Sequence, residues 1–289
     1  MRSPHPPKVL LSLAAAVVAI SAGGVLAVMA GDLPAASIGF WRVALAGLML
    51  SPALLSATGR EGLDRRVIVP LLLGGLCLAL HFWTWIASLQ RISVMRSVVL
   101  VTLAPLWVGL MEWKVEGRAP SRPFWLGVLT ALAGVVLMGL GSTEGLKGGD
   151  PIGDGLALVG GILSSTYLMI GRRLRQRVSA GAYGALVCGS AALWLLPIAL
   201  ISGPIWGFGL GSWAALLGMA IGPQILGHIG FAYAMRTVKA SLVATLILLE
   251  PVGATLLGML LLDQYPQPAE LGAGALILVG VAIASRSER

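Results

Sequence analysis

The stretch LCLALHFWTWIASL, residues 76–89, places a histidine, His81, in a run of apolar residues. A second stretch, IGPQILGHIGFAYAM at residues 221–235, repeats the arrangement, with His228 in an apolar run and Tyr233 shortly after it. The two histidines stand 147 positions apart, about half of the 289 residues. A polar group placed alike in two apolar halves indicates an internal repeat that carries polar side chains into a membrane.

Composition places the chain in a bilayer. Hydrophobic residues make up 57% of it and charged residues 11%, with a mean hydropathy of +0.90, whereas a soluble domain is about 25% charged. Apolar runs of 18 or more residues are typical of membrane helices. Turn-rich breaks divide the chain into ten expected helices, at residues 8–30, 35–57, 67–89, 93–113, 122–141, 152–172, 179–202, 210–234, 240–262 and 268–285.

The first of these helices resembles a signal peptide in its small residues, but it is long enough to span a bilayer. We therefore expect an uncleaved first helix and an all-α integral membrane protein with ten transmembrane helices.

The basic residues predict an orientation. With a cytoplasmic N-terminus, sixteen of the 20 lysines and arginines fall in cytoplasmic segments and three in outside segments. Such a bias is the positive-inside pattern of membrane proteins. It predicts a multi-pass protein of the inner (plasma) membrane with both termini in the cytoplasm. It also accounts for the net charge of +8, so the expected partner is the lipid bilayer and no nucleic acid.

The halves match with an offset of about half the chain. A shift of 147 places His81 on His228, and a shift of 146 places Pro105 on Pro251 and Gly134 on Gly280. We therefore expect two repeats of five helices, at residues 1–146 and 147–289. An odd number of spans gives the second repeat the opposite orientation, which is the inverted-topology arrangement of secondary transporters. Such transporters hold their substrate in a central cavity between the repeats.

Longer stretches of both halves carry a family resemblance. They are LHFWTWIASLQRISVMRSVVLVTLAPLWVGLMEW with FWLGVLTALAGVVLMGL, and FAYAMRTVKASLVATLILLEPVGATLLGMLLLDQYPQPAELGAGALILVGVAIA. Each has a short-linked helix pair, a mid-helix proline, an acidic residue at a helix end and a closing helix with Leu-Gly and Gly-Val. GFWRVALAGL, with Arg42, is similar to the family's second helix. The chain resembles the EamA-type transporters of the drug/metabolite transporter superfamily. Its length and aromatic residues are similar to amino-acid exporters of the YddG type.

Polar and aromatic side chains inside the expected helices are candidates to line the cavity. Trp85 stands four residues after His81 on the same helix face, and Gln224 stands four residues before His228. The histidines either line the cavity or form hydrogen bonds between helices. The candidate substrate-cavity residues are His81, Trp85, Trp107, Ser21, Ser164, Tyr167, Gln224, His228 and Tyr233.

Charged residues inside apolar spans are costly, so they are functional candidates. Glu250 precedes Pro251 in the ninth helix; the first repeat has Ala104 before Pro105. Both prolines are expected to kink their helices. Glu250 is a candidate for proton coupling, for a substrate ammonium or for an ion pair with Arg42, which itself could bind a carboxylate or reach the membrane surface. Glu112, at the end of the fourth helix, is expected to meet water or Lys114.

Together these features predict a secondary transporter that exports small metabolites by alternating access, with neutral or aromatic amino acids as the first choice of substrate. Nucleosides and organic cations or drugs are the alternatives, and an intramembrane enzyme is a further one. The sequence contains no HExxH, CxxC or Walker motif, so we expect no enzyme, no catalytic residues, no metal and no cofactor. We expect a monomer or a homodimer that binds a small-molecule substrate.

Overall fold

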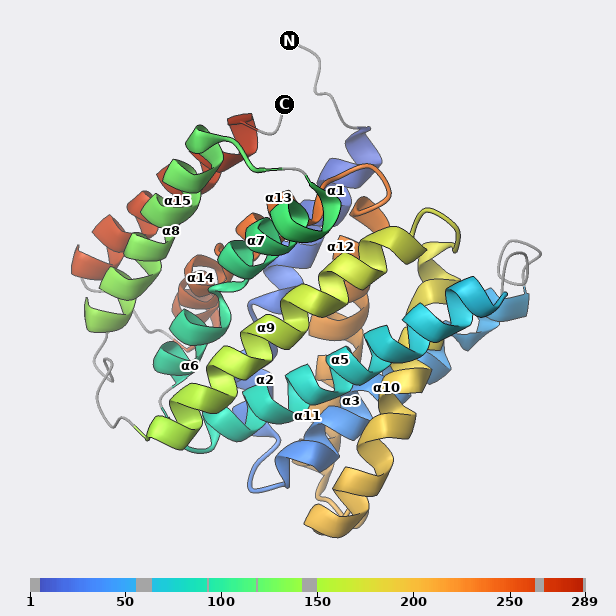
Figure 1. The fold of residues 1–289 in the computed structure, drawn as a ribbon. Coiled ribbons are helices and arrows are strands. Elements are labelled where there is room, and N and C mark those ends of the chain that lie inside the picture. Colours follow the sequence, from blue (N-terminus) through green and yellow to red (C-terminus); the bar gives the residue numbers. More distant parts are fainter. Residues whose placement is uncertain are drawn as a thin grey trace.

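A computed structural model describes residues 6–55, 64–92, 94–117, 119–141, 150–262 and 268–287, and these ranges form helices joined by short connections (Figure 1). Eight of the helical segments are long and apolar enough to cross a membrane, and residues 122–138 and 271–286 form two shorter apolar helices. The all-helical membrane fold predicted from the sequence is confirmed. The predicted boundary between residues 146 and 147 lies outside the described residues.

The first five spans occupy the N-terminal half. They are α1 (Pro7–Ile20) with α2 (Gly23–Met29), α3 (Ala35–Leu50) with the short 3₁₀ helix η1 (Ser51–Leu55), α5 (Arg65–Leu89), α6 (Val94–Val101) with α7 (Ala104–Glu116), and α8 (Arg122–Gly141).

The other five spans follow in the C-terminal half. They are α9 (Pro151–Leu174), α10 (Ala180–Ser202), α11 (Leu210–Met219) with η2 (Ala220–Ile229) and α12 (Gly230–Ala234), α13 (Ala240–Ile247) with α14 (Glu250–Leu262), and α15 (Pro268–Ser287). The element η2 is a π-helix of 10 residues.

Local chemistry accounts for several helix ends. Asp64, Asp150 and Ser179 are N-cap residues of α5, α9 and α10, and their side chains accept hydrogen bonds from backbone N–H groups of the first turn. Such caps satisfy donors that a helix start leaves free. At the other end of α7, Gly117 adopts a left-handed conformation with φ of 68°, which glycine reaches without steric cost.

Three spans are broken near their middle. The fourth and ninth break two residues before Pro105 and Pro251, so each proline lies in the first turn of the second half-helix, α7 or α14. Proline suits this position because its missing N–H would have no helical partner there. The first span breaks at Ser21, whose hydroxyl donates to the Val17 carbonyl at 2.8 Å. The sequence predicts the two proline sites but not the break at Ser21.

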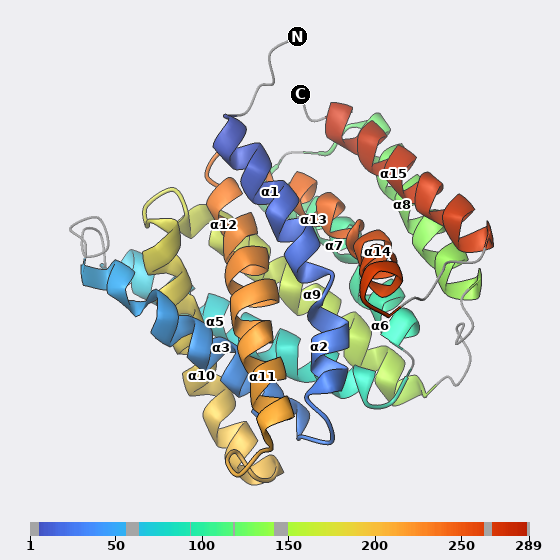
Figure 2. The same cartoon turned by 180° about the vertical axis from the view of Figure 1, so that it is seen from behind.

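The fifth and tenth spans, α8 and α15, lie side by side at the edge of the bundle in both views (Figures 1 and 2). Gly127 and Gly280 allow this approach. A Cβ atom on either glycine would stand 2.6 Å from the backbone oxygen of the other, which is too close for any larger residue. Small residues let membrane helices approach in this way.

The start of α1 and the end of α15 lie on the same side of the bundle (Figures 1 and 2). We call this the termini side. An even number of spans requires this arrangement, because each span crosses the bundle once.

Candidate functional site

A pocket lies in the interior, and both halves of the chain line it. Its lining includes Arg42 on α3, His81 and Trp85 on α5, Ser164 on α9 and His228 on η2, together with Ile20, Gly23, Phe82, Val101, Thr102, Ala104, Ile247 and Glu250. Its free space is about 40 Å³, enough for a few water molecules. A larger solute therefore enters only when the helices around the pocket move apart.

Arg42 is the cation of this pocket. Its side chain is among the largest that are fully buried, with 1% of the residue exposed, so it does not reach the membrane surface. Its Nε donates a 3.0 Å hydrogen bond to Oε1 of Gln224. Its guanidinium carbon lies 3.9 Å from the centroid of the Phe82 ring, a cation–π contact.

The two histidines meet in the pocket. Their ring centroids are 6.1 Å apart, and the His81 ring stacks on Trp85 at 6.3 Å. The Nδ1–H group of His81 donates to the Gly160 carbonyl at 2.9 Å, which ties α5 to α9. His81 therefore does both things that the sequence left open: it lines the pocket and it connects two helices.

His228 differs from His81 in its bonding. It lies on η2 among aromatic rings, with its centroid 5.3 Å from Phe82 and 6.1 Å from Tyr167. No hydrogen bond involves its ring within the described part of the chain. The π-helix that carries it is a form that often marks functional sites.

Glu250 stands at the first position of α14, and Ala104 stands at the first position of α7. Both residues line the pocket, so the two half-helices begin at the same place. Glu250 is buried. No ion pair within 4.0 Å joins it to Arg42 in the described residues; Arg42 instead bonds to Gln224.

Four further candidates lie near the pocket but not in its lining. Ser21 bonds within α1, and Gln224 is fully buried between Arg42 and the Cys188 sulfur. Tyr167 is buried next to His228 and stacks on Tyr183. Trp107 lies on α7, two residues beyond Pro105, and its indole N–H is buried without a hydrogen-bond partner in the described chain.

Tyr233 lies away from the pocket, and 41% of it is exposed. Five residues separate it from His228, which at about 100° per residue turns it roughly 140° from that histidine. In contrast, Trp85 lies one turn from His81 and its indole N–H is buried without a partner in the described residues. A ligand in an opened pocket could accept a hydrogen bond from it.

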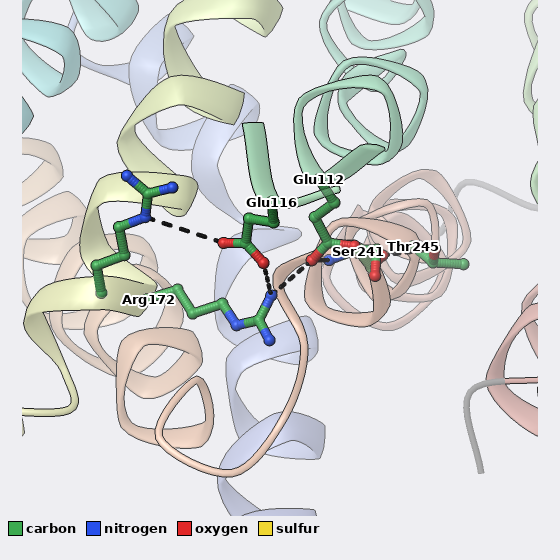
Figure 3. Close-up of polar contacts among 6 residues, drawn as sticks. Glu112, Glu116, Arg172, Ser241 and Thr245 are labelled. Atoms are coloured by element: carbon green, nitrogen blue, oxygen red, sulfur yellow. Dashed lines mark hydrogen bonds and ion pairs between the residues drawn. The ribbon is translucent and has the colours of Figure 1, made fainter. Parts of the chain in front are cut away.

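A second polar group lies at the termini side and was not expected from the sequence. It contains Glu112 and Glu116 at the end of α7, Arg172 and Arg173 at the end of α9, and Ser241 at the start of α13; we call it the Glu112 cluster (Figure 3). Arg172 Nη1 donates to Glu112 Oε1 at 2.8 Å, and the backbone N–H of Ser241 donates to the same oxygen at 3.3 Å.

The Glu112 cluster corrects the expected contact of Glu112 with water or Lys114. Glu112 is buried, and its partners come from α9 and α13. Lys114 is two residues further along α7, about 200° around the helix, and its ammonium lies 5.0 Å from the Trp113 ring instead. One carboxylate therefore joins a helix of the first repeat to two helices of the second.

On the side opposite the termini, a separate hollow lies close to the pocket. Three helices line both spaces. They are α2, α3 and α5, which contribute Gly23, Arg42 and Trp85 to the pocket and, one turn away, Ala27, Ile38 and Leu89 to the hollow. A single helical turn of about 5 Å therefore separates them. The pocket is thus separated by a thin layer from the side of the bundle opposite the termini.

Two ion pairs lie on the side opposite the termini. Arg96 contacts Asp154 at 2.6 Å and Arg91 contacts Asp150 at 2.8 Å. The Arg91 guanidinium lowers the pKa of the Asp150 carboxyl through its hydrogen bond, with help from the backbone N–H of Ile152. The described residues contain no group of three His, Cys, Asp or Glu side chains arranged as metal ligands.

An apolar bundle with charged and aromatic groups around one interior pocket defines a class, the multi-pass membrane transporters. A sequence profile of the EamA-like transporter family matches residues 7–140 and again residues 151–286. The chain therefore belongs to the EamA-like transporter family, and it contains two copies of the family's repeat.

Full-length relatives agree with this assignment. The chain is 28% identical over 252 residues to an uncharacterized transporter of Archaeoglobus fulgidus, covering 86% of each chain. It is 26% identical over 224 residues to the uncharacterized transporter YwfM of Bacillus subtilis, covering 75% of this chain and 73% of the relative. A crystal structure with 23% identity superposes with a TM-score of 0.81 over 99% of both chains, which supports the fold. The relatives from Archaeoglobus fulgidus and Bacillus subtilis are named as transporters, not as enzymes.

Proposed function

We propose that the chain is a secondary transporter that exports small amphipathic metabolites, with neutral and aromatic amino acids as its substrates. The observation that carries this proposal is the pocket lining. It combines one guanidinium, one carboxylate and two imidazoles with the aromatic rings of Phe82 and Trp85. Binding sites for small solutes are mostly apolar with a few placed polar groups. One positive and one negative side chain together suit a zwitterion.

The same proposal includes the orientation. The bias of basic residues supports a cytoplasmic termini side in the inner membrane. The Glu112 cluster then closes the cytoplasmic end, and the thin layer near Trp85 faces outside. Alternating access exchanges these two barriers around the pocket. The similarity to exporters of the YddG type supports the direction and the substrate class.

Glu250 is the proposed coupling group. It is a buried carboxylate at the start of a half-helix, and the ionisable groups that share its pocket are Arg42, His81 and His228. A proton taken up by Glu250 removes one charge from a low-dielectric site, which changes the balance between two conformations. Without this role the protein would be a facilitator driven by the solute gradient.

The test is transport by purified protein in liposomes, with labelled phenylalanine, leucine and threonine, a nucleoside (uridine) and an organic cation (ethidium). We expect saturable flux of phenylalanine and leucine. For the variants of pocket residues described below, Trp83→Phe is the matched control, because Trp83 is on α5 but faces outward. Flux of ethidium alone would favour the second candidate, an organic-cation exporter, for which Glu250 would supply the counter-charge. Flux of uridine alone would exclude the amino-acid proposal.

The coupling role has its own test. In liposomes with an imposed pH gradient, Glu250→Gln is expected to remove the stimulation of phenylalanine flux by the gradient. An unchanged pH dependence in this variant would show that another group, or none, carries the proton.

A further inference from the structure

Arg42 is held in a fixed position by two neutral groups. Gln224 accepts from its Nε at 3.0 Å, and the Phe82 ring lies under the guanidinium at 3.9 Å. Gln224 is itself fixed, because its amide nitrogen donates to the Cys188 sulfur at 3.4 Å. The side chain of Arg42 thus loses little further conformational freedom when it binds a ligand.

The terminal nitrogens of Arg42 remain available. Across the described ranges they make no hydrogen bond, and no carboxylate lies within 4.0 Å of them. Arg42 also lines the pocket. A buried guanidinium with no carboxylate in direct contact is costly in a membrane. Its planar pair of N–H donors matches the two oxygens of a carboxylate.

We propose that Arg42 binds the carboxylate of the transported solute, with Gln224 as the residue that positions it. This inference rests on the proposed function and specifies how the pocket selects its substrate. The carboxylate bonds to the terminal nitrogens of Arg42, and the solute's ammonium group lies toward Glu250. The solute supplies the directly bonded carboxylate that no described residue gives Arg42, since Glu250 shares the pocket but lies more than 4.0 Å from the guanidinium.

The lining favours a carboxylate over a phosphate group. A phosphate with nearly two negative charges would meet one guanidinium and also the negative charge of Glu250. A zwitterion presents one charge of each sign and is matched by one group of each sign. The aromatic rings of Phe82 and Trp85 then contact an apolar side chain on the solute.

The first experiment uses matched solutes on the unmodified protein. Thermal stabilisation in detergent and flux in liposomes are measured for L-phenylalanine, L-phenylalaninamide and phenethylamine, and for L-leucine with L-leucinamide. We expect each acid to bind about ten- to a hundredfold more tightly than its amide, the range for a hydrogen bond to a charged group. Equal binding of acid and amide would overturn the role of Arg42.

Three further variants separate binding from structure. Arg42→Gln is expected to abolish the preference for acid over amide, and Arg42→Lys, which keeps the charge but not the paired donors, to reduce it. Gln224→Glu leaves Arg42 in place and supplies an internal carboxylate. We expect this variant to remain folded, at least as stable as the unmodified protein, and to lose the acid preference. If Arg42 is only structural, Gln224→Glu keeps the preference.

These outcomes distinguish the two proposals. Flux of amides or amines alone overturns the role of Arg42 and leaves transport standing. No flux and no stabilisation with any of the five probes overturns the proposed substrate class and the role of Arg42 together. Retention of the acid preference in a folded Arg42→Gln variant overturns the role of Arg42 alone.

Discussion

The half-helices α7 and α14 begin alike, each with a proline at its second position and each at the pocket, but they differ in what they carry there. The first repeat presents Ala104 and the second presents Glu250. Seven residues beyond the proline the first has Glu112 and the second has Gly258. The two half-helices therefore begin with the same backbone arrangement but carry their carboxylates at different positions. The second repeat holds the pocket carboxylate, and the first holds the two carboxylates of the Glu112 cluster.

The largest effect is expected from removing the charge that distinguishes α14. Glu250→Ala should lower the initial rate of phenylalanine flux in liposomes about a hundredfold, because the proposed partner of the solute's ammonium is lost; losing one partner of a buried charge pair costs about 2–5 kcal/mol. Trp83→Phe should keep its rate. A Glu250→Ala rate within threefold of the unmodified protein would show that the difference between the repeats has no role in transport.

Removing the carboxylate that distinguishes α7 should affect stability. Glu112→Ala leaves Arg172 without its 2.8 Å partner and the Ser241 N–H without an acceptor. We expect a loss of about 3 kcal/mol in unfolding free energy, as for other buried pairs that lose one partner. Thermal unfolding in detergent measures it. Glu116→Ala, whose contacts with Arg172 and Arg173 are 3.4 and 3.9 Å, is the control and should lose less; equal losses would contradict the central place of Glu112.

The histidine pair gives a smaller contrast. His81 bonds to the Gly160 carbonyl, whereas the His228 ring makes no hydrogen bond among the described residues. His81→Ala should therefore be less stable than His228→Ala by about 1 kcal/mol, the net value of one hydrogen bond. Chemical denaturation of both variants in detergent tests this. A less stable His228→Ala would mean that the π-helix depends on its histidine more than α5 does.

The smallest effect is expected at the counterpart of Glu250. Ala104→Ser adds one hydroxyl at the start of α7, where a small polar group is tolerated. Stability should change by no more than about 1 kcal/mol, the central value for single substitutions, and phenylalanine flux by less than about threefold. Thermal unfolding and liposome flux measure the two quantities. A large loss of flux would show that the pocket depends on both half-helices equally.

Much of the fold follows from the sequence because a bilayer imposes long apolar helices. The spans, the repeat and the breaks at Pro105 and Pro251 each have a local signal. The repeat pairs His81 with His228, but their contact needs both positions to lie close to the symmetry axis, which the sequence does not show.

Other features had no local signal. Glu112 and Arg172 are 60 positions apart, and nothing in either stretch of sequence indicates their contact. The sequence alone therefore favours Lys114, two residues away, as the partner of Glu112. The π-helix also changes which residues share a face, and hydrophobic periodicity assumes the regular 3.6-residue turn. The position of Gln224 between Arg42 and Cys188 depends on packing among three helices, which one sequence does not specify.

The small volume of the pocket has a consequence for the cell. Space for a few water molecules does not hold a continuous file of water across the bilayer, and protons and ions cross membranes most readily along such files. An unloaded carrier of this shape leaks little current, so a cell can keep many copies in its membrane without discharging the electrochemical gradient on which its other transport depends.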